Sequence, residues 1–166
     1  MPVTDEIIPD VYVQPGECRL VKEPVTLCTV LGSCVGIAFH VPRLGIGALC
    51  HAMLPGCPVN GQVGMSASAK RRYVDFAIHD MAQHLDSLGA VRAETQVKLF
   101  GGADVLSVSE GSTRPSIGKL NCEAAIRVLE EEGFAVAASS LGGKSGVHIR
   151  FQTGTGEVFL RRLDSV

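Results

Sequence analysis

Two apolar, β-branched runs separated by a Gly-Ser turn constrain this chain more than any other feature. The runs cover residues 25–31 and 35–41, and Gly32-Ser33-Cys34 joins them. A third run, 46–53, follows the turn at Pro42-Arg43. These runs are typical of three consecutive strands. The first two are apolar on both faces, which predicts burial between two layers rather than in an exposed sheet.

Elsewhere the pattern changes from strand to helix and back. Apolar residues recur at helical spacing from Ser66 or Ser68 to about Leu88, and again over 118–133, where Asn121 is the candidate N-cap. Short strand patterns cover 96–100, 135–139, 147–152 and 158–162. About six or seven strands with two main helices between them favour an α+β layered fold over a regular βαβ repeat.

Composition limits the class of protein. A chain of 166 residues, 46% hydrophobic and 19% charged, fits one domain covering residues 1–166. Its net charge of -2 argues against nucleic-acid binding. The longest apolar run, 27–41, is broken by glycine and is shorter than the roughly 20 residues that span a bilayer. With an acidic N-terminus that lacks a signal pattern, we expect a cytoplasmic protein without membrane insertion.

The six cysteines form no dense framework, so reduced thiols are expected. Metal binding was weighed because Cys50, His51 and Cys57 are close in sequence. A fourth ligand is not evident, and neighbours in a strand point to opposite faces. We therefore expect no metal site.

Cys34 and His51 are the candidate catalytic pair. A cysteine acts as a nucleophile in its thiolate form, which a nearby imidazole or free backbone N–H groups favour. The turn at Gly32 and Ser33 raises Cys34 from the end of a buried strand and directs backbone N–H groups to where an oxyanion would form. His51, in the third run, is the candidate base. The alternative reading of Cys34 is a small buried hydrophobe.

The motifs that surround this pair resemble one family. They are Leu31-Gly32-Ser33-Cys34-Val35, Gly45-Ile46-Gly47-Ala48, His51-Ala52-Met53-Leu54-Pro55, Phe100-Gly101-Gly102-Ala103, Ile117-Gly118 with Asn121, and Leu141-Gly142-Gly143. In this order they closely resemble the chemoreceptor glutamine deamidase (CheD) family of bacterial and archaeal chemotaxis, over nearly the whole chain.

The resemblance implies an activity and a fold. Family members hydrolyse the side-chain amide of particular glutamines on methyl-accepting chemotaxis receptors, releasing ammonia and leaving glutamate. The matching cysteine is Cys34 and the matching histidine is His51, and no metal or organic cofactor is required. The implied fold is a layered α/β/β sandwich with mixed sheets, like that of deamidating bacterial toxins. Family members also bind a CheC-type phosphatase.

Two positions depart from the family pattern. The family often has a third catalytic residue, a threonine, six residues before the cysteine, where this chain has Cys28, with Thr29 one place along. Since neighbours in a strand face opposite ways, either a local bulge brings Thr29 round or another group, such as a backbone carbonyl, orients the imidazole. Val147 follows Gly146 where the family usually has an arginine.

These departures keep other functions open. One is a largely non-catalytic binding module that regulates a CheC-type phosphatase or a receptor, and another is a small-molecule amidase. The sequence does not indicate which glutamines are modified, which residues bind substrate, or the oligomeric state. Specificity depends on loops such as 55–65, which we expect to form a rim of the site.

Overall fold

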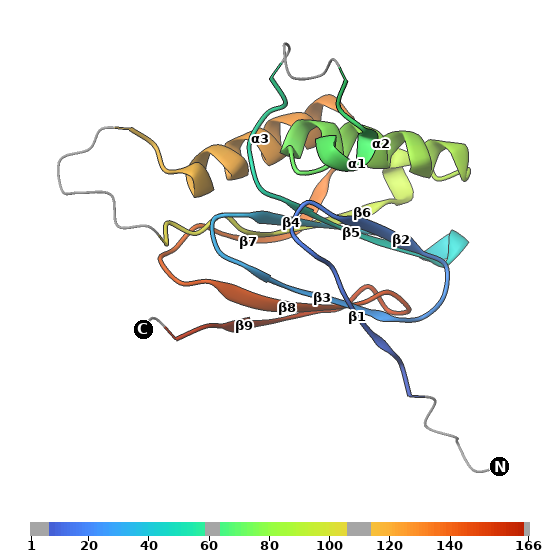
Figure 1. Cartoon of the computed structure of the whole chain (residues 1–166). Coiled ribbons are helices and arrows are strands. Elements are labelled where there is room, and N and C mark those ends of the chain that lie inside the picture. Colours follow the sequence, from blue (N-terminus) through green and yellow to red (C-terminus); the bar gives the residue numbers. More distant parts are fainter. Residues whose placement is uncertain (1–6, 59–63, 106–113, 165–166) are drawn as a thin grey trace.

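Two β-sheets and a layer of helices make up the computed structural model, which describes residues 7–58, 64–105 and 114–164 (Figure 1). One sheet has the order β1 (Asp10–Tyr12), β3 (Thr26–Leu31), β8 (Val147–Gln152), β9 (Val158–Arg162). The other has the order β2 (Cys18–Val21), β5 (Ile46–Ala52), β4 (Val35–Val41), β6 (Gln96–Gly101), β7 (Val136–Leu141). The pairs β1–β3 and β6–β7 are parallel and the others antiparallel, so both sheets are mixed.

The main helices, α2 (Val74–Ser87) and α3 (Ile117–Glu131), cover the outer face of the five-stranded sheet (Figure 1). The four-stranded sheet covers its other face. The order helix, sheet, sheet confirms the expected α/β/β sandwich with two main helices. The described residues also contain one-turn helices: η1 (Pro42–Leu44), α1 (Ala67–Lys70) and η3 (Arg92–Glu94).

Two apolar cores lie on either side of β4. Val35, Ile37 and Phe39 point to the helices, whereas Ala38 points to the other sheet. All seven residues of β4 are buried, as expected for a strand between layers. The same expectation was wrong for β3, because its strand lies in the outer sheet and Val30 on the outer face is 40% exposed.

The first predicted helix is interrupted. Ser66 does cap a helix, its hydroxyl accepting from the Ala69 N–H, but that helix is α1 and ends at Lys70. Tyr73 is extended, and the Arg72 carbonyl accepts the N–H groups of Met53 and Leu54. The N–H groups after β5 therefore occupy the Arg72 carbonyl, which would accept a backbone N–H in a continuous helix. A separate helix, α2, begins at Val74.

Two further sequence expectations need correction. The N-cap of α3 is Ser116, whose hydroxyl accepts from the Lys119 N–H, so Asn121 lies inside the helix and is fully buried. The sequence predicted only a strand or an arm, without a clear period, for the first fifteen or so residues, where β1 lies, and it did not predict β2. The two strands are three and four residues long, and their pairing with β3 and β5 decides their conformation more than their own sequence does.

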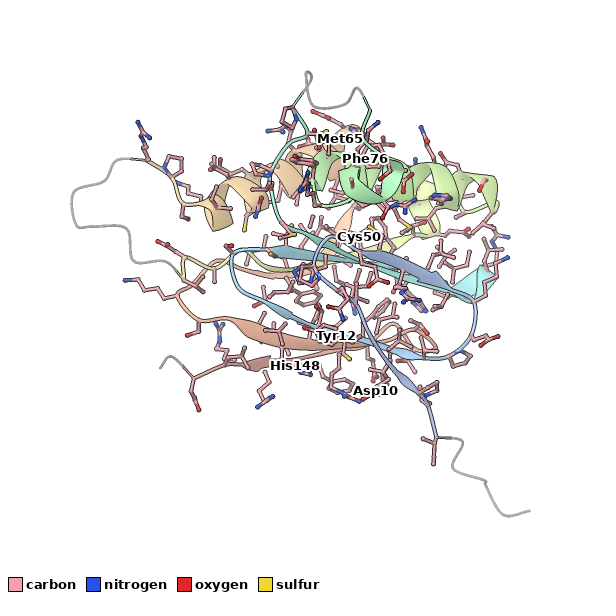
Figure 2. All side chains as sticks on the ribbon, viewed as in Figure 1. Asp10, Tyr12, Cys50, Met65, Phe76 and His148 are labelled. Carbon is pink, nitrogen blue, oxygen red and sulfur yellow. The ribbon has the colours of Figure 1, made fainter. Side chains whose placement is uncertain are left out.

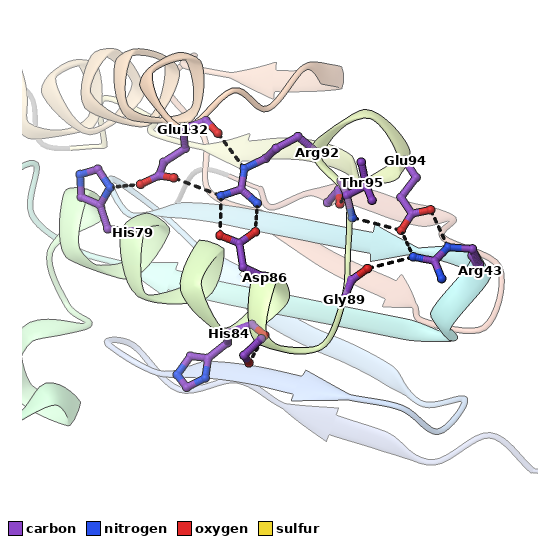
Figure 3. A network of polar contacts seen from close by, with 11 residues as sticks. Arg43, His79, His84, Asp86, Gly89, Arg92, Glu94, Thr95 and Glu132 are labelled. Carbon is purple, nitrogen blue, oxygen red and sulfur yellow. Dashed lines mark hydrogen bonds and ion pairs between the residues drawn. The ribbon is translucent and has the colours of Figure 1, made fainter.

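Arg92 joins the two main helices at one end (Figure 3). It donates to the Asp86 carboxylate on α2 and to the carboxylate and carbonyl of Glu132, which ends α3. Glu132 also pairs with His79 on α2, and the Arg92 guanidinium lies 4.4 Å from the Phe134 ring centroid. Since several charges share this network, we expect it to contribute more to the free energy of unfolding than isolated surface ion pairs do.

The two sheets approach each other closely at Gly47. A Cβ atom there would lie 2.5 Å from the Cβ of Thr153. Thr153 cannot move easily, because its hydroxyl accepts from the Val25 N–H and contacts the carbonyls of Glu23 and Val25. Gly47 is therefore required by space rather than by backbone conformation.

We expect Gly47→Ala to lower the free energy of unfolding by about 1–3 kcal/mol, because it overpacks the space between the sheets. Gly56→Ala is the control, since its Cβ would meet only the Asp75 carboxylate, with Oδ2 at 3.5 Å and Cγ at 4.0 Å. That variant should change the free energy by less than about 0.5 kcal/mol. Urea unfolding measures both, and equal effects would contradict the assigned contact.

Candidate active site

Cys34 and His51 face the space between the two sheets. Gly36 is directly opposite His51 in the β4–β5 ladder, and Cys34 lies two residues before Gly36. Diagonal neighbours of this kind are within reach of each other's side chains. Cys34 packs against the core between the sheets, and His51 is 2% exposed. Cys50 points the other way, toward the helices, as predicted (Figure 2).

Thr29 reaches the same space from the other sheet. Its Oγ1 lies 2.9 Å from His51 Nδ1, and its side chain is fully buried. The pairing of β3 with β8 runs without a shift from Thr26 to Leu31, so no bulge is needed. Thr29 lies on the inner face of β3, while Cys28 lies on the outer face with its Sγ 3.7 Å from the Val11 carbonyl oxygen. The group that orients the imidazole is therefore the Thr29 hydroxyl.

A third partner fixes the direction of this hydrogen bond. Thr29 Oγ1 also donates to the carbonyl of Val13, at 2.7 Å. Because a hydroxyl has only one proton, Thr29 must accept from Nδ1–H of His51. This tautomer leaves Nε2 unprotonated and free to act as a base. Sequence reasoning missed Val13, because its contribution is a backbone carbonyl that no motif encodes.

The backbone of His51 is held from the edge of its sheet. Its N–H donates to the Glu17 carbonyl at 2.9 Å, and its carbonyl accepts from the Gly16 N–H at 2.8 Å. Two residues thus oppose one, in the manner of a β-bulge. Gly16 has a positive φ of 81°, which suits glycine.

Burial keeps both members of the pair neutral. Burial lowers the pKa of His51 from 6.5 to about 4, partly opposed by the Val13 carbonyl. Burial also raises the pKa of the Cys34 thiol, partly opposed by its own backbone N–H. At neutral pH these shifts favour a neutral thiol and a neutral imidazole.

The end of β6 holds the turn that precedes Cys34. The Gly32 carbonyl accepts from the Ala103 N–H at 2.9 Å, and the Cys34 carbonyl accepts from the Gly102 N–H at 2.8 Å. Gly101 has a φ of 94°, and a Cβ there would lie 2.3 Å from the Cys34 carbonyl oxygen. The Phe-Gly-Gly-Ala motif is therefore the support of the turn.

The structure also places Val147, where the family usually has an arginine, and part of the loop that was expected to form a rim of the site. Val147 begins β8 opposite Leu31 and is 5% exposed, so it fills the core between the sheets. The loop 55–65 was expected to form a rim, but residues 59–63 lie outside the described residues. At its start, the Cys57 N–H donates to Asp75 Oδ1 at 3.0 Å, which ties the loop to α2.

Two further findings concern ligands and membranes. Within residues 7–58, 64–105 and 114–164, no group of three or more His, Cys, Asp or Glu side chains is placed to hold a metal ion. Across the same part of the chain, every helix is too short or too polar to cross a membrane.

Comparison with known proteins places this geometry in a family. The family model described as "CheD chemotactic sensory transduction" matches residues 53–162. A probable chemoreceptor glutamine deamidase CheD 2 of Geobacter sulfurreducens is 40% identical over 95% of this chain and 92% of that protein. A probable chemoreceptor glutamine deamidase CheD of Maridesulfovibrio salexigens is 37% identical over 99% of this chain and 98% of that protein.

Among solved structures, the hypothetical protein YfiH of Bacillus licheniformis is similar at a TM-score of 0.48, with 12% identity. The match covers 78% of this chain and 58% of that one, and at this level it identifies neither fold nor activity. The sequence relatives, in contrast, extend over the strands that carry Cys34 and His51. By the family match and these relatives, the chain belongs to the CheD family.

Proposed function

We propose that this chain is a protein-glutamine deamidase that acts on methyl-accepting chemotaxis receptors in the cytoplasm. It hydrolyses the side-chain amides of specific glutamines to glutamate and ammonia. The observation that carries the proposal is the hydrogen bond between Thr29 and His51 in the space that Cys34 also faces. The relatives, named as probable chemoreceptor glutamine deamidases, supply the substrate class.

The first half-reaction makes a thioester. Nε2 of His51 takes the Cys34 proton as Sγ bonds to the glutamine Cδ, and the amide oxygen becomes an oxyanion near the backbone N–H groups of the turn. The oxyanion then collapses, the Cδ–N bond breaks, and His51 gives its proton to the departing nitrogen. Ammonia leaves and the glutamyl group stays on Cys34.

The second half-reaction uses water. His51 removes a proton from the water as its oxygen attacks the thioester carbon. The C–S bond breaks, the sulfur leaves as thiolate, and proton return from His51 restores the thiol. Glutamate is released, and water is the only co-reactant in the balance.

The alternative function, a largely non-catalytic binding module, has two motives in the sequence. One is the cysteine at position 28, and the contact between Thr29 and His51 supports the catalytic function over this alternative. The other is Val147, which lies in the core between the sheets. Binding of a CheC-type phosphatase stays a prediction of the family resemblance.

We expect Cys34→Ala to abolish deamidation, because the thioester cannot form without the sulfur. Cys28→Ala is the matched control, since Cys28 faces away from His51. Mass spectrometry of chemoreceptor cytoplasmic fragments measures the reaction as a gain of about 1 Da per glutamine. Full activity of Cys34→Ala would refute the mechanism, and ammonia released from free glutamine alone would indicate a small-molecule amidase.

Replacing Thr29 with valine removes the hydroxyl and keeps the shape. Without an acceptor at Nδ1 the imidazole loses its fixed tautomer, so we expect kcat to fall about 10- to 100-fold, with KM little changed. Thr26→Val is the control, because Thr26 is buried on the opposite face of the same strand. Steady-state kinetics on a receptor fragment distinguish the two, and equal kcat values would remove Thr29 from the site.

The buried imidazole also predicts how stability depends on pH. His51 has a pKa of about 4 in the folded protein and 6.5 when unfolded, so the unfolded chain binds the proton between these values. The His51 contribution is complete above pH 6.5 and is lost as the pH falls toward 4. Between pH 7 and 5 the native protein should lose about 2 kcal/mol more than His51→Gln in urea unfolding. Parallel losses would mean that the folded imidazole titrates normally.

A further inference from the structure

Asn121 of α3 links the two ends of the candidate active site. Its Nδ2 donates to the Ser33 carbonyl at 2.9 Å and to the Met53 carbonyl at 3.0 Å. Ser33 immediately precedes Cys34, and Met53 follows His51 by two residues. One fully buried side chain in the helix layer therefore holds both strand ends.

The orientation of this amide is fixed by its neighbours. Both acceptors are carbonyl oxygens, so the NH₂ group must face them and Oδ1 must face away. Within the described residues Oδ1 is buried without a hydrogen-bond partner. A buried unpartnered oxygen disfavours folding, so packing alone does not account for an asparagine at this position.

The glycine at position 118 allows the first turn of α3 to lie close to the backbone that follows β6. A Cβ at Gly118 would come within 2.4 Å of the Ala103 carbonyl oxygen and 2.5 Å of that of Gly102. The first turn of α3 therefore rests directly on the backbone that follows β6. This close approach lets the short asparagine side chain reach the turn at Ser33.

The bond to Ser33 orients the peptide that joins it to Cys34. In a trans peptide the C=O and N–H point in opposite directions, and the structure has no cis bonds among its described residues. The Ser33 carbonyl points to the helix layer, so the Cys34 N–H points toward the space between the sheets. No backbone carbonyl of the described residues accepts from this N–H.

We propose that Asn121 is a positioning residue that aims the Cys34 N–H at the oxyanion of the reacting carbonyl group. Its second bond, to Met53, keeps the end of β5 at a fixed distance from this N–H. The proposal deepens the proposed function and rests on Cys34 as its nucleophile. It accounts for the asparagine that the sequence pattern had suggested as a helix cap.

The test compares two reactions of Cys34 that differ in one respect. Acylation by p-nitrophenyl acetate passes through an oxyanion: Sγ bonds to the carbonyl carbon as His51 takes the thiol proton, and the ester C–O bond then breaks, so that p-nitrophenolate leaves with the electron pair. Alkylation by iodoacetamide forms an S–C bond and expels iodide without an oxyanion. A group that only positions an oxyanion donor affects the first reaction and not the second.

Asn121→Ala leaves room for water to pair with the two carbonyls, so it should fold. In Asn121→Asp an oxygen replaces Nδ2 and repels both carbonyls. We expect each variant to acylate at least about tenfold more slowly than the native protein, with alkylation within about threefold. Val128→Ala is the control, because Val128 is a core residue on the same face of α3, about two turns after Asn121, and it should leave both rates unchanged.

Deamidation of a receptor fragment gives an independent reading, with a lower kcat and an unchanged KM expected for both variants. Parallel loss of acylation and alkylation, or no loss in either variant, would overturn the role of Asn121. A native protein that acylates but leaves receptor fragments unmodified overturns the proposed function alone. A native protein that forms no Cys34 thioester with either substrate overturns both proposals.

Discussion

The register of β4 against β5 is the constraint on which the rest of the site depends. With Gly36 opposite His51, the imidazole and the Cys34 thiol share the face that looks toward the second sheet. A slip of one residue would turn His51 to the helix layer and bring Cys50 in its place. Burial of β4 on both faces opposes such a slip, because all seven residues of the strand are buried.

The four-stranded sheet contributes hydrogen bonds at His51 as well as covering the pair Cys34 and His51. Thr29 comes from β3 and the Val13 carbonyl from the segment after β1, and together they fix the tautomer of His51. Burial of the imidazole between the sheets lowers its pKa, and the Val13 carbonyl partly opposes this shift. In the mechanism that we propose, the imidazole therefore acts as a general base on a neutral thiol, not as one member of a standing ion pair.

The helix layer adds a third support. The first turn of α3 lies on the backbone after β6, and Asn121 extends from α3 to the Ser33 carbonyl beside Cys34 and the Met53 carbonyl after β5. At its other end, α3 is joined to α2 through Arg92 and Glu132 (Figure 3). The candidate site lies between the two sheets. The five-stranded sheet carries His51, the four-stranded sheet contributes Thr29, and the helix layer contributes Asn121.

The sequence by itself predicted the strands around the Gly-Ser turn and the layered class of fold, and it indicated Cys34 and His51 as the candidate pair. These depend on local alternation and turn chemistry, which neighbouring residues decide. Only the tertiary structure decided that Thr29, and not Cys28, faces the imidazole, and that Asn121 lies inside α3 and not at its cap. Those outcomes depend on which face of a strand or helix meets another layer, and contacts between segments far apart in the chain set that choice.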